Sequence, residues 1–475
     1  MTETPQEATA ETRHDPDRPA ALLEFMTTGW APHDERLPEP HAAAPLRAAR
    51  RAAVADRFPG EVLVVPSGGY RSRAYDTEFW VRPGSEFAYL VGSHEPEAVL
   101  VIDASGQALL YQAPSMDRSS PSFFTDRMYG ELWVGPRPAL AATSALLGIE
   151  TRPLEELEKL SGKARVVRGL DARVEGLFDA EEEEADAELA VFLSEQRLVK
   201  DDHEIGQLQE AVDATILGFE DVVRQLPAAV QTSERWIEGV FGLRARVEGN
   251  DVGYGSICAA GAHACTLHWT DNDGEVREGD LVLLDMGVEG DELYTADVTR
   301  TLPVSGIFTD RQREVYTLVY EAQEAAIAAC KPGADFLGPH RAAMTVLAAG
   351  LERMGVLESA EAALAEDSQL YRRYTLHGVS HMLGIDVHDC AHARKQTYTR
   401  GTLQEGYVLT VEPGLYFQPD DLTVPEDLRG IGVRIEDDVV ITADGCRNLS
   451  GALPRHPDAV EAWMAGLREE SRGHF

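Results

Sequence analysis

Cysteine and long hydrophobic runs are scarce in this sequence. Its 475 residues include five cysteines, an odd number, and no two of them have CxxC spacing. This pattern argues against a disulfide framework and against a cysteine-rich zinc site, and it favours a reducing compartment. No apolar run approaches the ~18 residues of a membrane span, and residues 1–19 lack the apolar core of a signal peptide. We therefore expect a soluble protein of the cytoplasm.

Basic charge is scarce as well. The chain has 43 Lys and Arg against 81 Asp and Glu, only five residues are lysine, and the formal net charge is -38. Because such a surface repels phosphate groups, we expect neither a general nucleic-acid binder nor a membrane binder. Hydrophobic residues make up 44% of the chain, which excludes a mainly disordered protein.

The length predicts two to four domains, at ~100–200 residues per domain. Residues 1–44 are rich in Pro, Ala, Glu and Asp without sustained periodicity, and they predict a flexible N-terminal tail. Residues 45–197 alternate helical stretches with buried-strand runs such as 61–65 and 98–102, which predicts an N-terminal α/β domain. Residues 198–475 form the remaining part, in which strand–turn–strand stretches are mixed with helices.

Helix signals and one charge run mark this organisation. Apolar residues at helical spacing follow Asp201 and Asp202, one of which is the expected N-cap. A second helix is expected over 311–329, before the stop signal Lys331-Pro-Gly333. The acidic run 181–184 is interpreted as a solvated helix start or a linker.

Two aspartates flank a predicted turn in the C-terminal part. A strand-like run ends on Asp285, Asp297 follows twelve residues later, and the midpoint Asp291 lies in a stretch with turn chemistry. A hairpin folded there would place Asp285 directly opposite Asp297, with Cβ atoms ~5 Å apart. Two like charges at that distance are unfavourable unless a cation lies between them. From this pair alone, a cation site and a polar hairpin with solvated aspartates remain open.

Histidines cluster further along the chain. Four of the fourteen lie within sixteen residues, at His377, His381, His388 and His392. A lone histidine is usually a satisfied structural residue, but a cluster in an apolar, glycine-punctuated stretch favours a functional site. Residues 388–392 have the outer spacing of the HExxH zinc motif but lack its glutamate, and the preceding glycine and β-branched residues argue against a helix. A helical zinc-protease site is therefore not expected.

A second pair of carboxylates follows on later strands. The run 408–412 ends on Glu412 before a Pro-Gly turn, and in 430–438 the apolar side chains take one face while Arg434 and Glu436 take the other. A glutamate pointing inward from such a strand needs partners. Arg434 can supply one and a metal ion a stronger one, and an Arg–Glu pair on an exposed face is the alternative.

These residues together make four oxygen donors and one nitrogen donor, namely Asp285, Asp297, Glu412, Glu436 and His381. No thiolate takes part, so the set suits Mn²⁺, Co²⁺, Fe²⁺ or Zn²⁺ rather than a structural thiolate zinc. Five ligands, with carboxylates able to bridge, are enough for two ions ~3.5–4 Å apart, which would acidify a shared water into a hydroxide nucleophile.

The sequence resembles the pita-bread metallopeptidases, and within them the Xaa-Pro aminopeptidases (the aminopeptidase P family). A weaker match in the N-terminal part is clearest at 95–98. The resemblance implies an α/β (α+β) fold, with an N-terminal α/β domain before a C-terminal pita-bread domain of two pseudo-symmetric halves. The matching segments stand in the family's order across most of residues 200–450, and they are Thr266-Leu-His-Trp269, Asp285, Ala296-Asp-Val-Thr-Arg300, His377-Gly-Val-Ser-His381, Gly384-Ile-Asp-Val-His-Asp389, Thr410-Val-Glu-Pro-Gly-Leu-Tyr416 and Gly430-Ile-Gly-Val-Arg-Ile-Glu-Asp-Asp438.

The resemblance also implies how the metal ligands divide their work. Asp285 would chelate one ion, and His381 and Glu412 would hold the second. Asp297 and Glu436 would bridge both. The ions would be two divalent cations, with Mn²⁺ as the first choice and Co²⁺, Zn²⁺ or Fe²⁺ as alternatives.

Catalytic and substrate-binding roles are implied in the same way. Glu412 would act as general base toward the shared water and then pass its proton to the leaving nitrogen of proline. His388 and His268 would line the site and stabilise the tetrahedral oxyanion. His377 and Arg434 would contact substrate or orient ligands.

The implied function is a metal-dependent aminopeptidase that hydrolyses the N-terminal Xaa-Pro bond of peptides and assembles as a homo-oligomer, a dimer or a tetramer. A prolidase restricted to Xaa-Pro dipeptides is one alternative, and a non-catalytic peptide- or protein-binding module is another. This chain departs from its relatives in two places. The two aspartates are twelve rather than eleven residues apart, which implies a longer hairpin tip, and Cys390-Ala391 replaces the usual Val-Gly.

Overall fold

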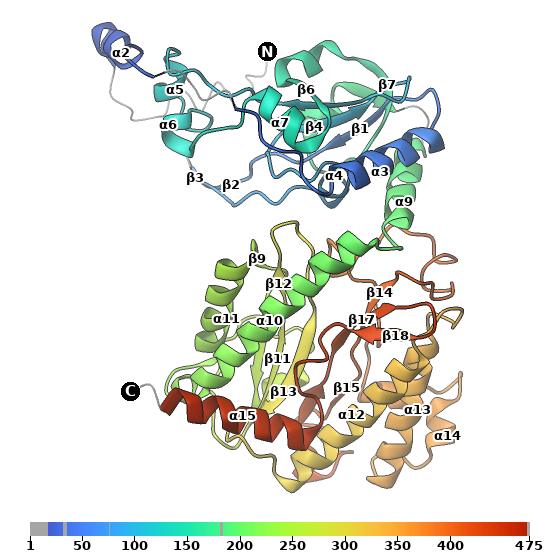
Figure 1. The fold of residues 1–475 in the computed structure, drawn as a ribbon. Helices are drawn as coiled ribbons and strands as arrows, with labels where there is room; N and C mark the ends of the chain where they lie inside the picture. Colours follow the sequence, from blue (N-terminus) through green and yellow to red (C-terminus); the bar gives the residue numbers. More distant parts are fainter. Residues whose placement is uncertain (1–17, 32–35, 76, 181–183, 473–475) are drawn as a thin grey trace, which may run out of the picture. The chain divides into compact units, whose positions relative to one another are not determined.

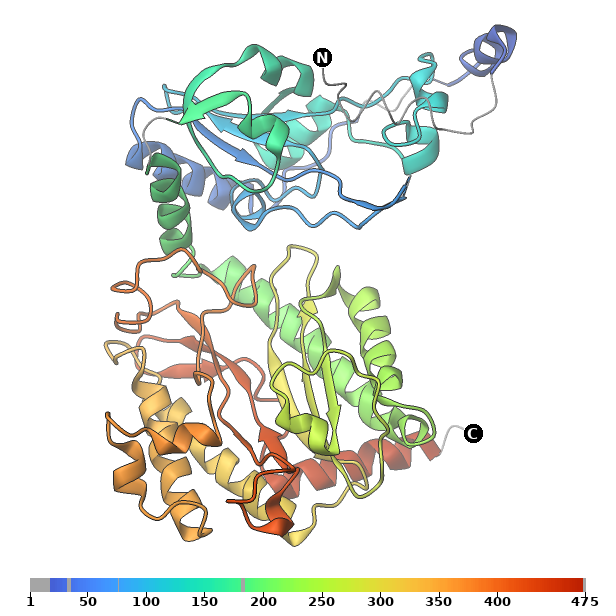
Figure 2. The same ribbon diagram turned by 180° about the vertical axis from the view of Figure 1, so that it is seen from behind.

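The computed structural model describes residues 18–31, 36–75, 77–180 and 184–472. It divides into two compact units, Met1–Glu183 and Glu184–Phe475, whose elements are shown from two sides in Figures 1 and 2. Strands and helices are mixed in both units, and the expected α/β fold class is confirmed.

The second unit begins before helix α9 (Ala185–Gln196), whereas the sequence predicts the boundary after it, at residue 197. The helix is tied to the second unit by side chains near its end. Glu195 accepts from the guanidinium of Arg394 at 2.7 Å, and the Ser194 hydroxyl accepts from the backbone N–H of His392 at 3.3 Å. The capping signal at Asp201 marks the start of the next helix and not the start of the unit.

The described part of the segment predicted as a tail contains helix α2. Residues 1–17 lie outside the described residues, whereas residues 20–26 form α2 (Ala20–Met26), which buries none of its side chains. The ring of Trp30 stacks on Phe124 with centroids 6.2 Å apart. Of the acidic run 181–184, only Glu184 is described, and it is the N-cap residue of α9.

The first unit is built on a six-stranded mixed sheet of order β6-β5-β4-β1-β7-β8. The predicted strand runs form its adjacent, fully buried strands β1 and β4, which pair antiparallel. The strands are β1 (Leu63–Pro66), β4 (Val99–Ile102), β5 (Ala108–Gln112), β6 (Glu150–Pro153), β7 (Gly162–Val166) and β8 (Phe178–Ala180). The helices are α3 (Ala44–Arg57), α4 (Ser85–Val91), α5 (Ser122–Thr125), α6 (Glu131–Val134), α7 (Leu140–Leu147) and α8 (Ala172–Glu175), and a short hairpin joins β2 (Ser72–Ala74) to β3 (Thr77–Glu78).

The second unit consists of two halves, each with a helix pair beside a three-stranded sheet, as implied for a pita-bread domain (Figures 1 and 2). The first half holds α10 (Asp202–Ala229), α11 (Glu234–Glu248), β10 (Ile257–Ala260), β11 (Leu281–Met286) and β13 (Val298–Pro303). The second half holds α12 (Asp310–Ala329), α13 (Gly338–Arg353), β14 (Val408–Val411), β17 (Asp437–Ile441) and β18 (Cys446–Asn448). Shorter elements are β9 (Asp251–Val252), β12 (Val288–Glu289), α14 (Ala360–Leu364), β15 (Gly414–Tyr416) and β16 (Gly432–Arg434), and α15 (Pro457–Arg472) follows at the end.

Helices α10 and α12 begin where their capping residues predict. The Asp201 carboxylate accepts from the backbone N–H of Glu204, and the Glu204 carboxylate accepts from the N–H of Asp201, both at 3.0 Å. Thr309 and Gln312 form the same reciprocal arrangement on α12. These contacts satisfy N–H groups that have no partner inside a helix.

The hairpin that carries the two aspartates has a different register from the predicted one. Asp285 pairs with Thr299, so the expectation that it directly opposes Asp297 is wrong. The hairpin is centred on Glu292, one residue after the predicted midpoint Asp291. Each residue of the first strand therefore pairs with a residue two positions later than predicted. Because side chains alternate with period two, the two aspartates still share one face and lie diagonally across the strands.

The alternating stretch 430–438 is also not one strand. Its first part, β16, pairs with β15, and its second part, β17, pairs with β14. Glu436 lies between the two parts, where its backbone N–H donates to the carbonyl oxygen of Thr299 at 3.0 Å. The change of partner therefore brings Glu436 from the second half against β13 of the first half.

A buried ion pair joins the two halves near this crossing. Arg300 on β13 contacts Asp437 on β17 at 2.7 Å, and both side chains are 0% exposed. The guanidinium also donates to the carbonyl oxygens of Glu436, Leu453 and Pro454. Desolvation by burial acts to raise the pKa of Asp437, but Arg300 and Arg455 outweigh it and the pKa is lowered.

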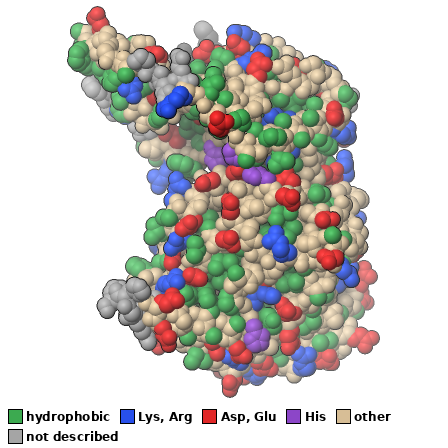
Figure 3. Space-filling model, viewed as in Figure 1, with side chains coloured by type: hydrophobic (Ala, Val, Ile, Leu, Met, Phe, Trp, Pro, Cys, Tyr) green, Lys and Arg blue, Asp and Glu red, His purple; other side chains and the backbone are tan. Residues whose placement is uncertain are grey.

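Charge on the surface is dispersed. On the face drawn in Figure 3, acidic side chains are scattered and basic ones lie among them. This distribution favours solubility over the binding of one highly charged partner on that face. No helix in the described part of the chain is long and apolar enough to cross a membrane.

Replacing Arg300 with Leu is expected to lower the free energy of unfolding of the second unit by about 3–5 kcal/mol, because Asp437 would stay buried without its main partner. The midpoint of urea unfolding, followed by fluorescence, checks this. The control is Arg277→Leu, which breaks an ion pair with Glu275 whose side chains are 71% and 76% exposed and which should change stability little. Superimposable unfolding curves for Arg300→Leu and the unsubstituted protein would contradict the assignment.

Candidate metal centre and active site

A cavity of about 630 Å³ in the second unit gathers the candidate site residues predicted from the sequence. They arrive from β11, from the start of β13, from the loops around residues 268 and 377–388, and from the ends of β14 and β16. All nine line this one cavity, and they are Asp285, Asp297, Glu412, Glu436, His268, His377, His381, His388 and Arg434.

Asp285 and Asp297 are linked by a tyrosine. The Tyr254 hydroxyl lies 2.7 Å from Oδ1 of Asp285 and 2.6 Å from Oδ1 of Asp297. Desolvation by burial and these two carboxylates raise the pKa of Tyr254 well above its usual value, so it remains a neutral donor. Desolvation also raises the pKa of Asp285, against the opposing charge of Arg434.

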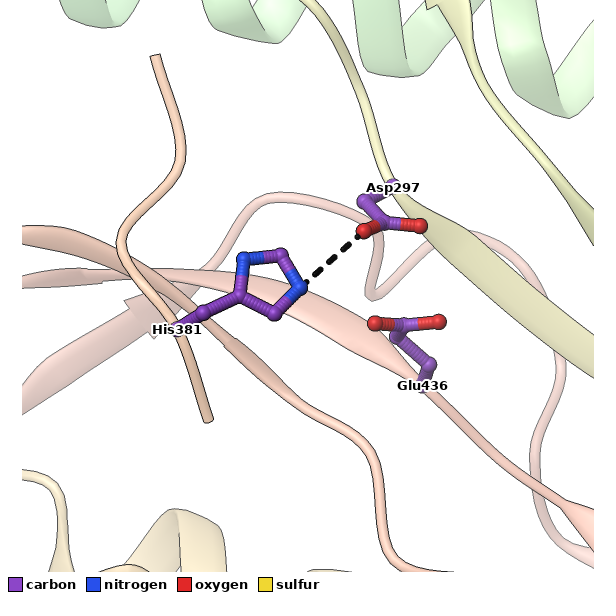
Figure 4. A group of neighbouring side chains, drawn as sticks. All are labelled: Asp297, His381 and Glu436. Atoms are coloured by element: carbon purple, nitrogen blue, oxygen red, sulfur yellow. Dashed lines mark ion pairs between the residues drawn. The ribbon is translucent and has the colours of Figure 1, made fainter. Parts of the chain in front are cut away.

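Asp297, His381 and Glu436 point toward one another from three separate segments (Figure 4). Each of the three residues offers one ligand atom, and these three atoms lie within 4.8 Å of one another. His381 Nε2 is 3.3 Å from Oδ2 of Asp297 and 3.6 Å from Oε1 of Glu412. Desolvation acts to lower the pKa of His381, yet the two carboxylates raise it to about 9, which indicates a strongly negative environment.

The other ring nitrogen of His381 has its own partner. Nδ1 lies 3.2 Å from the carbonyl oxygen of Met382. With a proton on Nδ1 donated to this carbonyl, Nε2 faces the carboxylates and could exchange its own proton for a cation. Histidines that bind metals are held in this way, since the second nitrogen sets the tautomer and the ring orientation.

Glu436 is the most deeply buried of the four carboxylates, at 1% exposure. The Thr299 hydroxyl donates to its Oε2 at 2.6 Å, whereas its Oε1 has no hydrogen-bond partner among the described residues. Desolvation, followed by the charges of Asp297 and Glu412, raises the pKa of Glu436 well above its usual value. Desolvation likewise raises the pKa of Glu412, to about 7.

The donor set fits divalent cations. Four carboxylates and one imidazole nitrogen converge where burial makes their negative charge unfavourable, and one buried carboxylate oxygen lacks a protein partner. Cations between them would remove the repulsion and supply that partner. Oxygen-rich sets with one or two histidines are those of catalytic transition-metal sites.

Arg434 contacts one of the predicted ligands, Asp285. Its Nη2 donates to Oδ2 of Asp285 at 2.6 Å and its Nη1 to the Tyr416 hydroxyl at 2.9 Å, and the residue is only 3% exposed. Its charge therefore holds Asp285 in place from the protein side. Of the two roles that the resemblance allows Arg434, these contacts favour the orientation of ligands.

The three remaining histidines differ in how they meet the cavity. His377 Nε2 lies 2.8 Å from the Tyr416 hydroxyl, and desolvation together with Arg434 lowers its pKa to about 4, so the ring is neutral. His388 is exposed and meets the ring of His381 edge-on, with centroids 4.4 Å apart. His268 is also exposed at the cavity wall. The exposed pair can donate to a substrate without moving a buried group.

The loop that carries His388 is anchored by buried ion pairs. Lys200 Nζ contacts Oδ2 of Asp389 at 2.8 Å, with both side chains at most 1% exposed, and Arg197 contacts the same carboxylate at 3.4 Å. These cations lower the pKa of Asp389 although desolvation acts to raise it. Residues 381–400 contain no helix, which confirms that a helical HExxH-type site is absent there.

Sequence reasoning missed three residues that contact the predicted ligands. Thr299 donates to Glu436, and Asp438 Oδ2 accepts from the backbone N–H of Asp297 at 3.1 Å. Each of these lies two positions after a predicted ligand, Asp297 or Glu436, so the period of two could have indicated them. Tyr254 is 31 residues before Asp285, and no local pattern points to it.

Comparison with known proteins agrees with this geometry. The family models for "Metallopeptidase family M24" and "Aminopeptidase P, N-terminal domain" match residues 206–443 and 47–166. Xaa-Pro aminopeptidase 1 of Streptomyces coelicolor is 56% identical over 455 residues, which cover 94% of this chain and 92% of that protein. Xaa-Pro aminopeptidase of Escherichia coli is 32% identical, with 89% and 97% covered.

Solved structures show the same similarity over most of the chain. Aminopeptidase P from E. coli with the inhibitor Pro-Leu superposes with a TM-score of 0.79 at 29% identity, covering 90% of this chain and 100% of that one. Aminopeptidase PepP of Pseudomonas aeruginosa gives a TM-score of 0.79 at 29% identity, with 90% and 99% covered. The chain therefore belongs to metallopeptidase family M24, has the two-domain organisation of the aminopeptidase P proteins, and is a metal-dependent aminopeptidase.

Proposed function

We propose that the chain hydrolyses the bond between an N-terminal residue and a proline in second position, and that two divalent ions serve the reaction. The observation that carries this proposal is the convergence of five ligand side chains and two exposed histidines on one cavity. The relatives named Xaa-Pro aminopeptidases support the choice of substrate.

The proposed ligands are Asp285, Asp297, His381, Glu412 and Glu436, with Asp297 and Glu436 as the bridging pair. When bound, two divalent ions, for which the oxygen-rich set favours Mn²⁺, would make a water nucleophilic at neutral pH and polarise the scissile carbonyl. The position of Asp297 supports its bridging role, because Tyr254 links one of its oxygens to Asp285 while the other lies 3.3 Å from His381 Nε2. Glu436 lies in the same group as Asp297 and His381.

Glu412 is the proposed general base. Its side chain is 16% exposed, against 12% for Asp285 and 7% for Asp297, so it is the most accessible of these carboxylates. It can accept a proton from water in the cavity and later donate it to the departing prolyl nitrogen. His377 Nδ1, 3.4 Å from Oε2 of Glu412, limits the positions open to the carboxylate.

His388 and His268 are the proposed donors to the oxyanion. Both line the cavity with exposed rings. An N–H aimed at the carbonyl oxygen stabilises the charge that develops there in the tetrahedral state. Their exposure in the cavity that the carboxylates line suits this role, since a substrate can reach exposed rings.

The chemistry of proline is compatible with such a site. A bond to proline has no N–H, and the residue before proline is restricted in conformation. A peptidase site that binds the extended backbone of its substrate therefore cleaves such a bond poorly. A site of metal ions and carboxylates can instead bind the free amine at the N-terminus. This contact requires nothing from the nitrogen of the scissile bond.

We further propose that the enzyme works in the cytoplasm as a homo-oligomer. All five cysteines are free thiols, in keeping with a reducing compartment. The first unit is the proposed place for contacts between subunits, because it contributes none of the proposed ligands.

Metal dependence and proline specificity can be tested with one panel of peptides. We expect cleavage of Xaa-Pro-Xaa peptides and not of matched Xaa-Ala-Xaa peptides, loss of cleavage after dialysis against a chelator, and recovery with Mn²⁺ in preference to Co²⁺ or Zn²⁺. Product is measured by chromatography and metal content by elemental analysis. Cleavage that persists after all metal has been removed would refute the proposal.

Glu436→Gln keeps the shape of the side chain and removes its charge. We expect loss of at least one bound ion and a fall in kcat/KM of more than about 100-fold. Replacing even a residue that only contacts a metal ligand lowers metal affinity or activity by ~10–100-fold. Asp444→Asn, an exposed carboxylate on the same half, is the matched control and should leave both quantities unchanged. Normal metal content and turnover in Glu436→Gln would remove it from the ligand set.

Substrate length separates an aminopeptidase from a prolidase. A dipeptidase has to bind the proline carboxylate, and Arg434, the nearest cation of the cavity, is already bonded to Asp285 and Tyr416. We therefore expect kcat/KM for Xaa-Pro-Xaa tripeptides to exceed that for Xaa-Pro dipeptides by about tenfold or more. A preference for the dipeptide in the same assay would establish the prolidase alternative.

A further inference from the structure

A second cavity, of about 250 Å³, adjoins the catalytic one. The two share His377, Gly378 and Ser380 as lining residues. The other walls of the second cavity come from the start of α13 and from the 3₁₀ helix η3 (Leu370–Arg373), which contribute His340 and Arg372. A peptide anchored by its N-terminus in the catalytic cavity therefore has a neighbouring cavity for residues beyond the scissile bond.

The second cavity differs from the first in charge. Asp and Glu are absent from its lining, all of which is described, although the chain as a whole carries a net charge of -38. The guanidinium of Arg372 is exposed and donates to the side-chain oxygen of Gln369 at 3.1 Å, a neutral acceptor. Desolvation and the charges of Arg372 and Arg341 lower the pKa of His340. The one formally charged side chain of this lining is thus the cation Arg372, which suits an anion.

Three buried polar atoms of this lining have no hydrogen-bond partner within the described part of the chain. They are Nδ1 of His340, Oγ1 of Thr375 and Oγ of Ser380. Thr375 is 2% exposed, so bulk water does not reach its hydroxyl freely. Buried polar groups in folded proteins are nearly always hydrogen-bonded, and a group that is not usually marks a ligand or an ordered water.

We propose that the second cavity binds the C-terminal carboxylate of short peptide substrates. Arg372 would supply the charge, the Thr375 and Ser380 hydroxyls would donate to the carboxylate oxygens, and the His340 ring would complete the contact. The inference rests on the proposed function, because the N-terminus of the same peptide has to be held at the acidic cluster. The Arg372 guanidinium at one end and the proposed metal and carboxylate centre at the other would then orient a peptide along the two cavities.

The test compares peptides that differ only in their C-terminal charge. A series from Xaa-Pro to a pentapeptide is prepared with free carboxylates and as C-terminal amides. At one length or more, we expect the KM of the acid to be lower than that of the amide by about tenfold, as for a hydrogen-bonded charge, with kcat little changed. Equal KM values at every length would overturn the inference. Failure to cleave either form would instead refute the proposed function.

Variants of the lining residues test whether the difference in KM between acid and amide arises in this cavity. Arg372→Met and Thr375→Val should each raise the KM of the acid toward that of the amide. Arg353→Met, an exposed arginine at the end of α13 outside this lining, is the matched control and should keep the wild-type difference. An effect of Arg353→Met equal to that of Arg372→Met would show a general charge effect and overturn the inference.

Thr375→Val also separates binding from a structural role. Because its hydroxyl has no protein partner, replacing it with a methyl group should not lower the melting temperature of the free enzyme. A drop in melting temperature with equal changes in the KM of acid and amide would contradict the proposal. A peptide amide with glutamate at its last position tells whether a side-chain carboxylate can occupy the same place, by whether its KM falls to that of the free acid.

Discussion

The second unit depends on one electrostatic constraint, which is that four carboxylates must stay close together in a place with little water. Desolvation by burial raises the pKa of Asp285, Glu412 and Glu436 together, so the cluster resists full ionisation on its own. The protein meets part of this cost with neutral and cationic donors, such as the hydroxyl of Tyr254 and the guanidinium of Arg434. The negative charge that these donors leave unbalanced explains why the site suits divalent cations. It also explains why an oxygen of Glu436 can lack a hydrogen-bond partner among the described residues.

The same constraint accounts for the architecture around the cluster. No single hairpin could deliver all the ligands, so they come from both halves of the unit and have to be held in register. The halves are joined behind the site by the buried pair of Arg300 and Asp437, and the histidine loop is held by Lys200 and Asp389. These ion pairs are fully desolvated, and breaking one would leave a buried charge without a partner, which makes the arrangement of the two halves specific.

The two adjoining cavities also differ in the charge of their lining residues. The first is lined by the four carboxylates proposed as metal ligands, whereas the second has arginine, histidine and hydroxyl groups and no acidic residue. A chain with a net charge of -38 thus contains a cavity whose lining has an arginine and no acidic residue, next to one lined by four carboxylates. The overall charge, spread over the visible surface (Figure 3), has no direct part in this selectivity.

Local signals in the sequence determined the donor types, their order along the chain, the capped starts of α10 and α12, and hence the class of chemistry, because each depends on residues near one another in the chain. Only the tertiary structure decided which atoms meet. The hairpin is centred on Glu292 instead of Asp291, the strand breaks at Glu436 to reach β13, and Tyr254 joins from 31 residues away. The second cavity around Thr375 likewise has no signature in the sequence. These features arise from pairing and packing between distant segments, whose free energies no local pattern records.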